Sequence, residues 1–112
     1  MVKIDFRRQF MSLPGDTQDH SKDDPINKVL AFILSQVEHS KDPVKLWGWA
    51  LELANKGYLE IDKSDTEFLR KTVLETPMLK AAGTAQILEI IDMAKNNVLE
   101  ILKGEKEGGK HE

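Results

Sequence analysis

Apolar residues recur through most of the chain at intervals of three and four, the spacing of amphipathic helices. This pattern predicts helices over residues 25–39, 43–56 and about 65–75, and a longer helical stretch over 78–103. The positions that these helices are expected to bury together form the predicted core: Leu30, Ile33, Val37, Trp47, Leu51, Phe68, Leu69, Ile87, Ile91 and Val98.

Short polar signals mark where three of the helices begin. Asp24-Pro25 and Asp42-Pro43 each place a side-chain acceptor at an N-cap and a proline at the first helical position, where its missing N–H would be unpaired anyway. Ser64 and Glu67 have the spacing of a capping box, in which each side chain accepts a backbone N–H of the other. The first, second and third helices are therefore predicted to carry side-chain caps.

Glycine and proline signals predict where the helices end. Gly57 is suited to the position after the second helix, and the residue before Pro77 disfavours helical geometry, which ends the third. In the last stretch, Gly83-Thr84 is expected to interrupt the helix near its start, and Gly104 to end it.

Two short segments alternate apolar and polar residues, the period typical of a half-buried strand. They are residues 3–6 and 58–61. Each segment is the only strand with which the other could form backbone hydrogen bonds. Because a two-stranded ribbon is only marginally stable alone, it needs helices packed against it. The predicted fold class is therefore mainly α, a small four-helix domain with a short two-stranded β ribbon.

The chain divides into three expected parts. Residues 1–24 hold the N-terminal strand and a polar, acidic loop, 25–103 form the helical domain, and 104–112 form a disordered tail. The loop has no apolar residue from Gly15 to Asp24, and whether it becomes ordered on a partner is left open.

The amino-acid composition excludes several classes of protein and of functional site. The chain has no cysteine, which excludes a disulfide scaffold, thiolate catalysis and iron–sulfur clusters. Its longest apolar run, Val29 to Leu34, is far too short to span a bilayer, and the N-terminus lacks the apolar stretch of a signal peptide, so we expect a cytoplasmic protein without membrane association. A net charge of −3 supplies no overall attraction to nucleic acid.

Candidate catalytic and metal-binding patterns are missing. The aspartates around His20 do not follow the spacing of a calcium loop, so we predict no metal site and no cofactor. His20, His39 and His111 fall in a loop, at a helix end and in the tail, and no metalloprotease, serine-hydrolase or phosphate-loop motif occurs. We therefore predict that the protein is not an enzyme.

The second helix carries two tryptophans, Trp47 and Trp49, which point about 200° apart and cannot both enter one core face. Trp47 is assigned to the core with its helical neighbours Val44, Ala50, Leu51 and Ala54. Trp49 aligns with Leu46 and Leu53 in a second apolar strip. That strip is either covered by a neighbouring helix or exposed as an anchor for a partner, since tryptophan is common among interface hot spots.

The last helix offers a second candidate interface. Its apolar seam, made of Ile87, Ile91, Ala94, Val98 and Ile101, averages the 3.5-residue period of a coiled coil and is broadened by neighbouring leucines. One side can pack on the domain while the excess faces a second copy, or a single chain can satisfy all of it. The candidate protein-interface residues are thus Leu46, Trp49, Leu53, Leu99, Ile101 and Leu102.

A nucleic-acid-associated regulator is the competing hypothesis. Arg7, Arg8 and Lys28 would then lie near phosphates, and the first two helices would form a helix-turn-helix. The second helix, however, is aliphatic where a recognition helix usually carries arginine, asparagine or glutamine. A nucleic-acid partner therefore ranks below a protein partner.

The segments KIDF, KVLAFILSQ, DPVKLWGWALELANKGYLEIDKSDTEFLRK and AQILEIIDMAK follow one another between residues 3 and 95. In this order the chain resembles a group of small, mostly uncharacterised helical proteins encoded by bacteriophages and prophages. The resemblance implies a prophage setting and supplies no catalytic residue, and LKAAGT departs from the uninterrupted helix expected there. We expect a non-enzymatic interaction or assembly protein whose partner is a phage structural or assembly protein.

Overall fold

The computed structural model describes residues 1–17, 22–38 and 40–111, and the side chains of residues 98–111 lie outside that description. The elements in chain order are β1 (Val2–Asp5), α1 (Ile26–Ser35), α2 (Pro43–Asn55), β2 (Tyr58–Ile61), α3 (Lys63–Glu75) and α4 (Ala81–His111). The predicted mainly α fold with a two-stranded ribbon is thereby confirmed.

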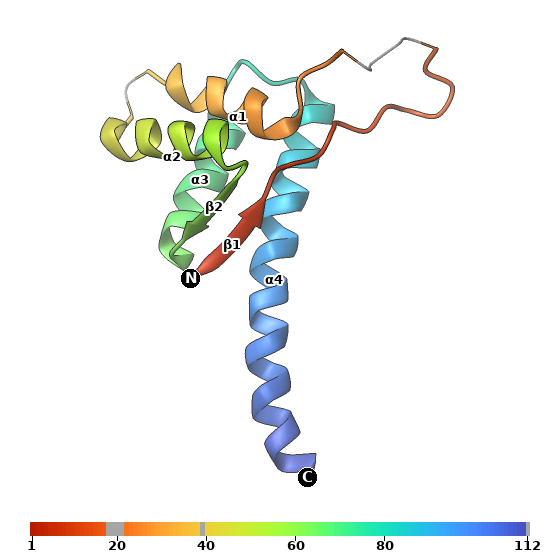
Figure 1. Ribbon diagram of the computed structural model, residues 1–112, viewed down its shortest axis with the longest axis vertical. Helices are drawn as coiled ribbons and strands as arrows, with labels where there is room; N and C mark the ends of the chain where they lie inside the picture. The colour runs from red at the N-terminus through yellow and green to blue at the C-terminus, as the bar shows by residue number, and fades with distance from the viewer. Residues whose placement is uncertain (18–21, 39, 112) are drawn as a thin grey trace.

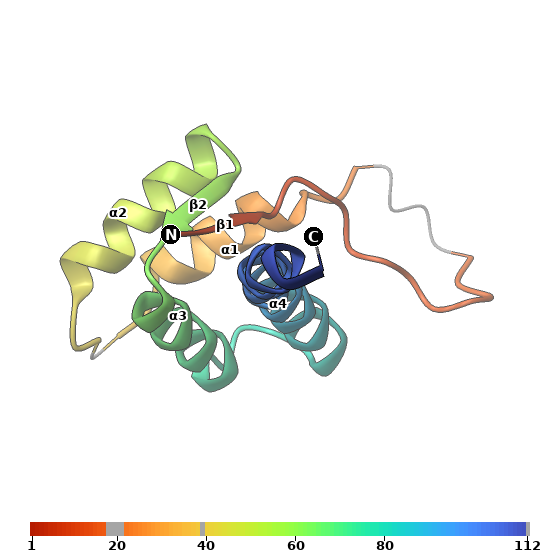
Figure 2. The same cartoon turned by 90° about the horizontal axis from the view of Figure 1, so that it is seen from below.

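The ribbon lies at the centre of the fold, between the α1–α2 pair and the α3–α4 pair (Figures 1 and 2). β1 and β2 are antiparallel, with Val2 opposite Ile61 and Ile4 opposite Leu59. These four side chains are buried, as the period of two predicts, and the helices cover the face that they form. β1 is therefore part of the core and not only an entry to the helical domain.

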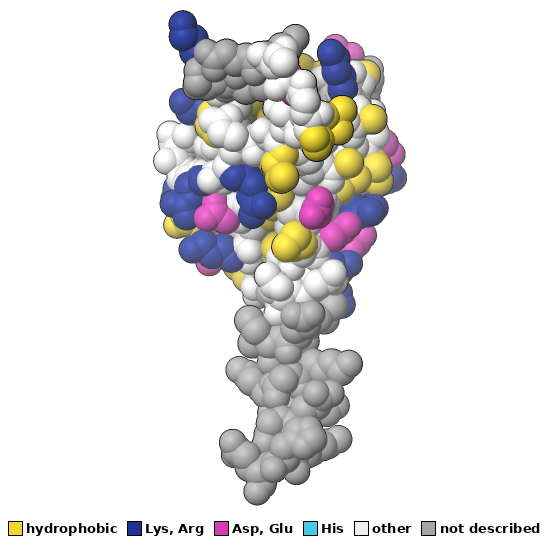
Figure 3. All heavy atoms as spheres, turned by 90° about the vertical axis from the view of Figure 1, so that its right-hand side faces the viewer, with side chains coloured by type: hydrophobic (Ala, Val, Ile, Leu, Met, Phe, Trp, Pro, Cys, Tyr) yellow, Lys and Arg dark blue, Asp and Glu magenta, His cyan; other side chains and the backbone are white. Residues whose placement is uncertain are grey.

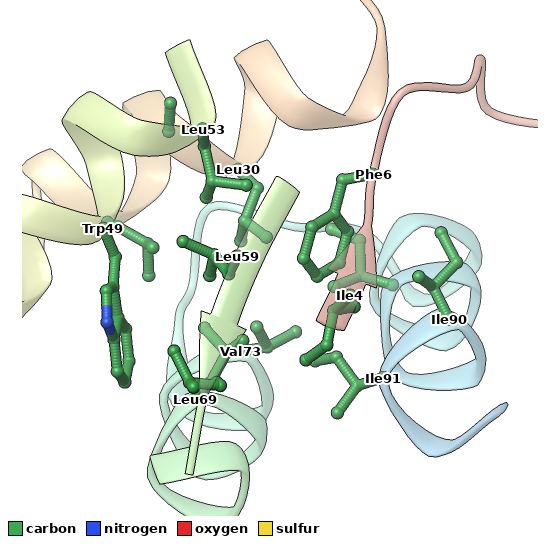
Figure 4. Packing of buried hydrophobic residues seen from close by; sticks show 14 of the residues in the cluster. Ile4, Phe6, Leu30, Trp49, Leu53, Leu59, Leu69, Val73, Ile90 and Ile91 are labelled. Atoms are coloured by element: carbon green, nitrogen blue, oxygen red, sulfur yellow. The ribbon is translucent and has the colours of Figure 1, made fainter. Parts of the chain in front are cut away.

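The core gathers side chains from every element (Figure 4). Of the predicted core residues, Leu30, Ile33, Leu69, Ile87 and Ile91 are buried, and Val37 and Phe68 are partly buried against the cluster. The side chain of Val98 lies outside the described residues. Trp47 and Leu51 are exposed, so their assignment to the core is wrong.

The start of α1 is capped by the chain around β1 and not by Asp24. Pro25 is the N-cap residue, and no side chain caps the helix. The N–H groups of Ile26 and Asn27 donate instead to the carbonyls of Arg8 and Phe6, at 2.8 and 3.0 Å. Because distant backbone satisfies these donors, the predicted aspartate cap has no N–H left to accept.

α1 also ends earlier than predicted, at Ser35. The hydroxyl of Ser35 donates to the carbonyl of Phe32 at 2.6 Å, and the N–H of Gln36 donates to Ile33 at 3.0 Å. These bonds tighten the last turn and compete with continuation of the helix.

The predicted capping box of α3 is wrong, because Ser64 lies inside the first turn. Asp62 is the N-cap residue, and its carbonyl accepts from both the N–H and the hydroxyl of Thr66. Glu67 forms an ion pair with Lys95 on α4 and does not reach back to the helix start. The end of α3 at Glu75, just before Thr76-Pro77, agrees with the prediction.

α4 runs without interruption through both Gly83 and Gly104, where the sequence predicted a break and an end. A single glycine inside a helix costs about 1 kcal/mol relative to alanine, which packing can offset. At Gly83 an added Cβ would lie 3.3 Å from Leu79 and 3.6 Å from Phe10. The glycine therefore makes room for two side chains that pack at the edge of the core.

The segment between β1 and α1 is hydrogen-bonded to the side chain of Gln86 on α4 and then leads away from the helices (Figure 1). The amide of Gln86 accepts from the N–H of Met11 at 2.7 Å and donates to its carbonyl at 3.0 Å. A turn follows, in which the N–H of Asp16 donates to Leu13 and Gly15 adopts a φ of +90°. His20 lies outside the described residues.

Candidate interaction surface

Helix α2 carries the candidate surface, and local signals fix both of its ends. Asp42 accepts the N–H of Lys45 at 3.0 Å and caps the helix as predicted, with Pro43 in the first position. At the other end Gly57 adopts a φ of +84°, which a residue with a side chain rarely adopts. The predicted bounds of this helix are correct to within one residue.

The inner face of α2 consists of Leu46, Trp49, Ala50 and Leu53, all buried. Trp49 is only 7% exposed and points into the core (Figure 4). Its ring centre lies 5.8 Å from that of Phe68 on α3. Leu46, Trp49 and Leu53 were candidate interface residues, with coverage by a neighbouring helix as the alternative. They belong to the core, so the strip is covered and their assignment to an exposed interface is corrected.

The outer face of α2 carries the apolar strip that the sequence placed in the core. Val44 is 80% exposed, Trp47 55% and Leu51 45%. We call these three residues the α2 stripe. Gly48 lies among them at the same helical spacing, and an added Cβ there would meet no atom within 4 Å.

The rotation of α2 about its axis is fixed by its neighbours. Lys45 forms an ion pair with Asp65 on α3, with 2.7 Å between Nζ and Oδ1, and its ammonium lies 6.0 Å from the centre of the Trp49 ring. The hydrogen bond to Asp65 is the main cause of a raised pKa of Lys45. One sequence signal favours this orientation without determining it, because Gly48 has no side chain to bury and lies on the face that the core does not use.

A shallow groove of about 490 Å³ lies beside the α2 stripe. Val44 of the stripe and its neighbour Gly48 also line the groove, so the groove and the stripe are continuous. The charged side chains that line the groove are five carboxylates and one lysine: Asp42, Glu52, Glu60, Asp62, Asp65 and Lys45. We call this feature the acidic groove.

A second cleft, of about 720 Å³, lies between the chain after α1 and the end of α3. Its hydroxyl groups already make structural hydrogen bonds, since Ser40 accepts from the N–H of Asp42 and Thr72 donates to the carbonyl of Phe68. Lys71 and Glu75 on its rim are well exposed and 3.9 Å apart. Among the lining residues that the structure describes, no hydroxyl is therefore hydrogen-bonded to a basic side chain.

The α4 seam packs on its own domain as far as the structure describes it. Ile87 and Ile91 are buried and Ala94 is partly buried. The side chains of Leu99, Ile101 and Leu102, which complete the predicted interface, lie outside the described residues, as do those of Val98 and His111. Dimerisation through this helix stays a prediction.

The basic residues proposed to meet phosphates, Arg7, Arg8 and Lys28, are all exposed, and Arg7 already has an acidic partner within the domain. Arg7 donates to Asp5 through Nε and Nη2, at 3.0 and 2.7 Å, and this hydrogen bonding lowers the pKa of Asp5 to about 2. The Arg7 guanidinium also lies 5.4 Å from the centre of the Tyr58 ring. On the face shown in Figure 3, basic, acidic and hydrophobic side chains are interspersed.

Within the described part of the chain, no group of three or more histidine, cysteine, aspartate or glutamate side chains is arranged to hold a metal ion. The same residues include no helix that is long and apolar enough to cross a membrane. Comparison with known protein families, with curated proteins and with solved structures finds no match.

Proposed function

We propose that this protein is a non-enzymatic protein–protein interaction module of a phage or prophage, and that the α2 stripe is its binding surface. The observation that carries the proposal is the exposure of Trp47 between Val44 and Leu51, on a helix whose other face is fully packed. Tryptophan is over-represented among the residues that dominate binding energy at interfaces.

The size of the stripe supports binding through one strong anchor. A tryptophan has a surface of up to about 250 Å², so the exposed 55% of Trp47 amounts to roughly 140 Å². At about 25 cal/mol per Å², covering it would contribute up to about 3 kcal/mol. Association costs at least about 4 kcal/mol in lost freedom, so a partner must also cover Val44, Leu51 and the surrounding surface.

A nucleic-acid partner fits the same helix less well. Residues 36–42 separate α1 from α2, whereas a helix-turn-helix joins its helices by about three or four residues. The outer face of α2 presents apolar side chains beside the acidic groove, which repels phosphates. The role in phage assembly is supported by the sequence resemblance alone.

Site-specific photo-crosslinking tests the proposal. A photoreactive amino acid replaces Trp47 in the full chain, and a matched variant carries it in place of Met93, which is 51% exposed on α4. We expect a defined protein adduct from position 47 and none from position 93 in cells that express the neighbouring genes. Excess unlabelled protein should compete the adduct away, whereas excess Trp47→Ala protein should not.

Two results would overturn the proposal. One is the same set of adducts from both positions, or none from position 47. The other is DNA binding by the purified protein that falls steeply between low and moderate salt, which would favour the nucleic-acid regulator.

A further inference from the structure

We propose that the partner of the α2 stripe is a basic amphipathic helix, with apolar side chains on the stripe and lysine or arginine side chains in the acidic groove. This inference rests on the proposed function of α2 as a binding surface. It follows from two features of the structure, the position of Gly48 and the charge beside it.

Gly48 is not required by close packing within the described part of its own domain. Glycine is among the least favourable residues inside a helix, and this one is exposed, with no atom within 4 Å of the position that a Cβ would occupy. Its lack of a side chain leaves a notch between Val44, Trp47 and Leu51. Such a notch allows a partner side chain or backbone to approach the axis of α2 closely, as in the packing of one helix against another.

The shape of the stripe sets the length of the partner. Val44 and Leu51 are seven residues apart, which corresponds to about 10.5 Å along the helix. Apolar side chains at i, i+3, i+4 and i+7 of a second helix cover the same distance. A partner segment of about three turns is therefore long enough to engage the whole stripe.

The acidic groove sets the charge of the partner. Its five carboxylates, together with Lys45 and the α-amino group of Met1, give a net charge of −3, as negative as that of the whole chain. Lys45 is already paired with Asp65, and among the described residues Glu52, Glu60 and Asp62 form no ion pair. A basic segment on the stripe would supply the missing counter-charges, whereas an acidic one would be repelled.

A second copy of this chain would not supply the positive charge that the acidic groove requires of its partner. If two α2 stripes packed against each other about a twofold axis, their acidic grooves would be brought close together. The like charges would then oppose association. Complementary charge therefore favours a different, basic partner.

The test uses two synthetic peptides of about 14 residues and the full-length protein. Both peptides have leucines at i, i+3, i+4 and i+7, and the flanking positions are lysine in one peptide and glutamate in the other. Binding is followed by fluorescence anisotropy of the labelled peptide. We expect the lysine peptide to bind at least about tenfold more tightly than the glutamate peptide, with an affinity that falls as salt rises.

Variants then locate the binding. Trp47→Ala should weaken binding of the lysine peptide about tenfold or more. Glu52→Gln with Glu60→Gln should weaken it several-fold and reduce its salt dependence. The matched control, Glu38→Gln with Glu89→Gln, removes the same charge from exposed residues outside the groove and should leave binding unchanged.

Gly48→Ala separates a binding role from a structural one. Alanine favours the helix and meets no atom of the domain, so the melting temperature should rise by a few degrees. A side chain in the notch should nevertheless weaken peptide binding. A variant that is more stable and binds as tightly as the wild type would overturn the role of Gly48.

The remaining outcomes decide between the inference and the function on which it rests. Tighter binding of the glutamate peptide, lost on Trp47→Ala, would overturn the basic partner and keep the α2 stripe as a binding surface. The inference would be overturned if Trp47→Ala left the affinity for the lysine peptide unchanged, or if neither peptide bound. A dimer that dissociates on Trp47→Ala would replace the basic partner by a second copy. The proposed function fails separately, through the crosslinking result at position 47.

Discussion

The two tryptophans of α2 provide a direct test of the fold and of the exposed stripe, because only one of them belongs to the core. Trp49→Ala removes a side chain that packs against Phe68, whereas Trp47→Ala removes one that lies on the surface. We expect Trp49→Ala to lower the free energy of unfolding far more than Trp47→Ala.

The exposed fractions of the two residues give the size of the difference. Trp47 is 55% exposed and Trp49 7%, so Trp49 buries about half a tryptophan surface more, roughly 120 Å². At about 25 cal/mol per Å², this corresponds to a difference of about 3 kcal/mol between the two variants. Trp49→Ala alone should cost about 3–5 kcal/mol, the usual range for a buried tryptophan.

Urea unfolding followed by circular dichroism measures both variants on the same scale. The conservative variants Trp47→Phe and Trp49→Phe provide a second measurement in the folded state. With Trp47→Phe, the remaining emission of Trp49 should be blue-shifted and resist quenching by acrylamide, and Trp49→Phe should show the reverse. The orientation of α2 would be refuted if the two alanine variants were equally destabilised, or if acrylamide readily quenched the Trp49 emission of Trp47→Phe.

Three further predictions concern the ends of the ribbon and the segment that follows it. Gly57→Ala should cost about 2 kcal/mol in urea unfolding, because φ is +84° and the new Cβ would lie 2.3 Å from Cγ of Arg7. Asp5→Asn should lower stability near pH 7 by less than about 1 kcal/mol, since the pair with Arg7 is half exposed. Gln86→Ala should speed hydrogen exchange in residues 9–13 and change global stability by less than about 1 kcal/mol.

Each of these has a comparison that could contradict it. Gly15→Ala shares a positive φ, +90°, but meets no atom within 4 Å, so a cost equal to that of Gly57→Ala would show that the clash is unimportant. Folding lowers the pKa of Asp5 from 3.8 to about 2, so its contribution is present above pH 4 and is lost as the pH falls through 2. A gap between Asp5→Asn and wild type that is as large at pH 2 as at pH 7 would therefore contradict the pairing. Exchange that Gln86→Ala leaves unchanged would show that the segment is held by other contacts.

The structure also shows which kinds of sequence signal were informative. The caps of α2 were predictable, because Asp42 and Gly57 act on backbone groups within a few residues of themselves. The cap of α1 was not, because Phe6 and Arg8 lie far from Ile26 in the sequence, and β1 must be in place before their carbonyls can accept. Glu67 likewise formed an ion pair with Lys95 on another helix in place of its predicted local hydrogen bond.

The sequence by itself determined the order of the elements, the fold class and the pairing of residues 3–6 with 58–61 to within one position. These properties depend on periodicity and on short-range capping, which every segment carries within itself. The sequence also showed that α2 has two apolar strips. It did not determine which strip is buried, since the free energy of burying apolar surface depends on area and hardly on direction. Only the packing of α2 against α1, β2 and α3 made that choice, and it left Trp47 on the surface and placed Trp49 in the core.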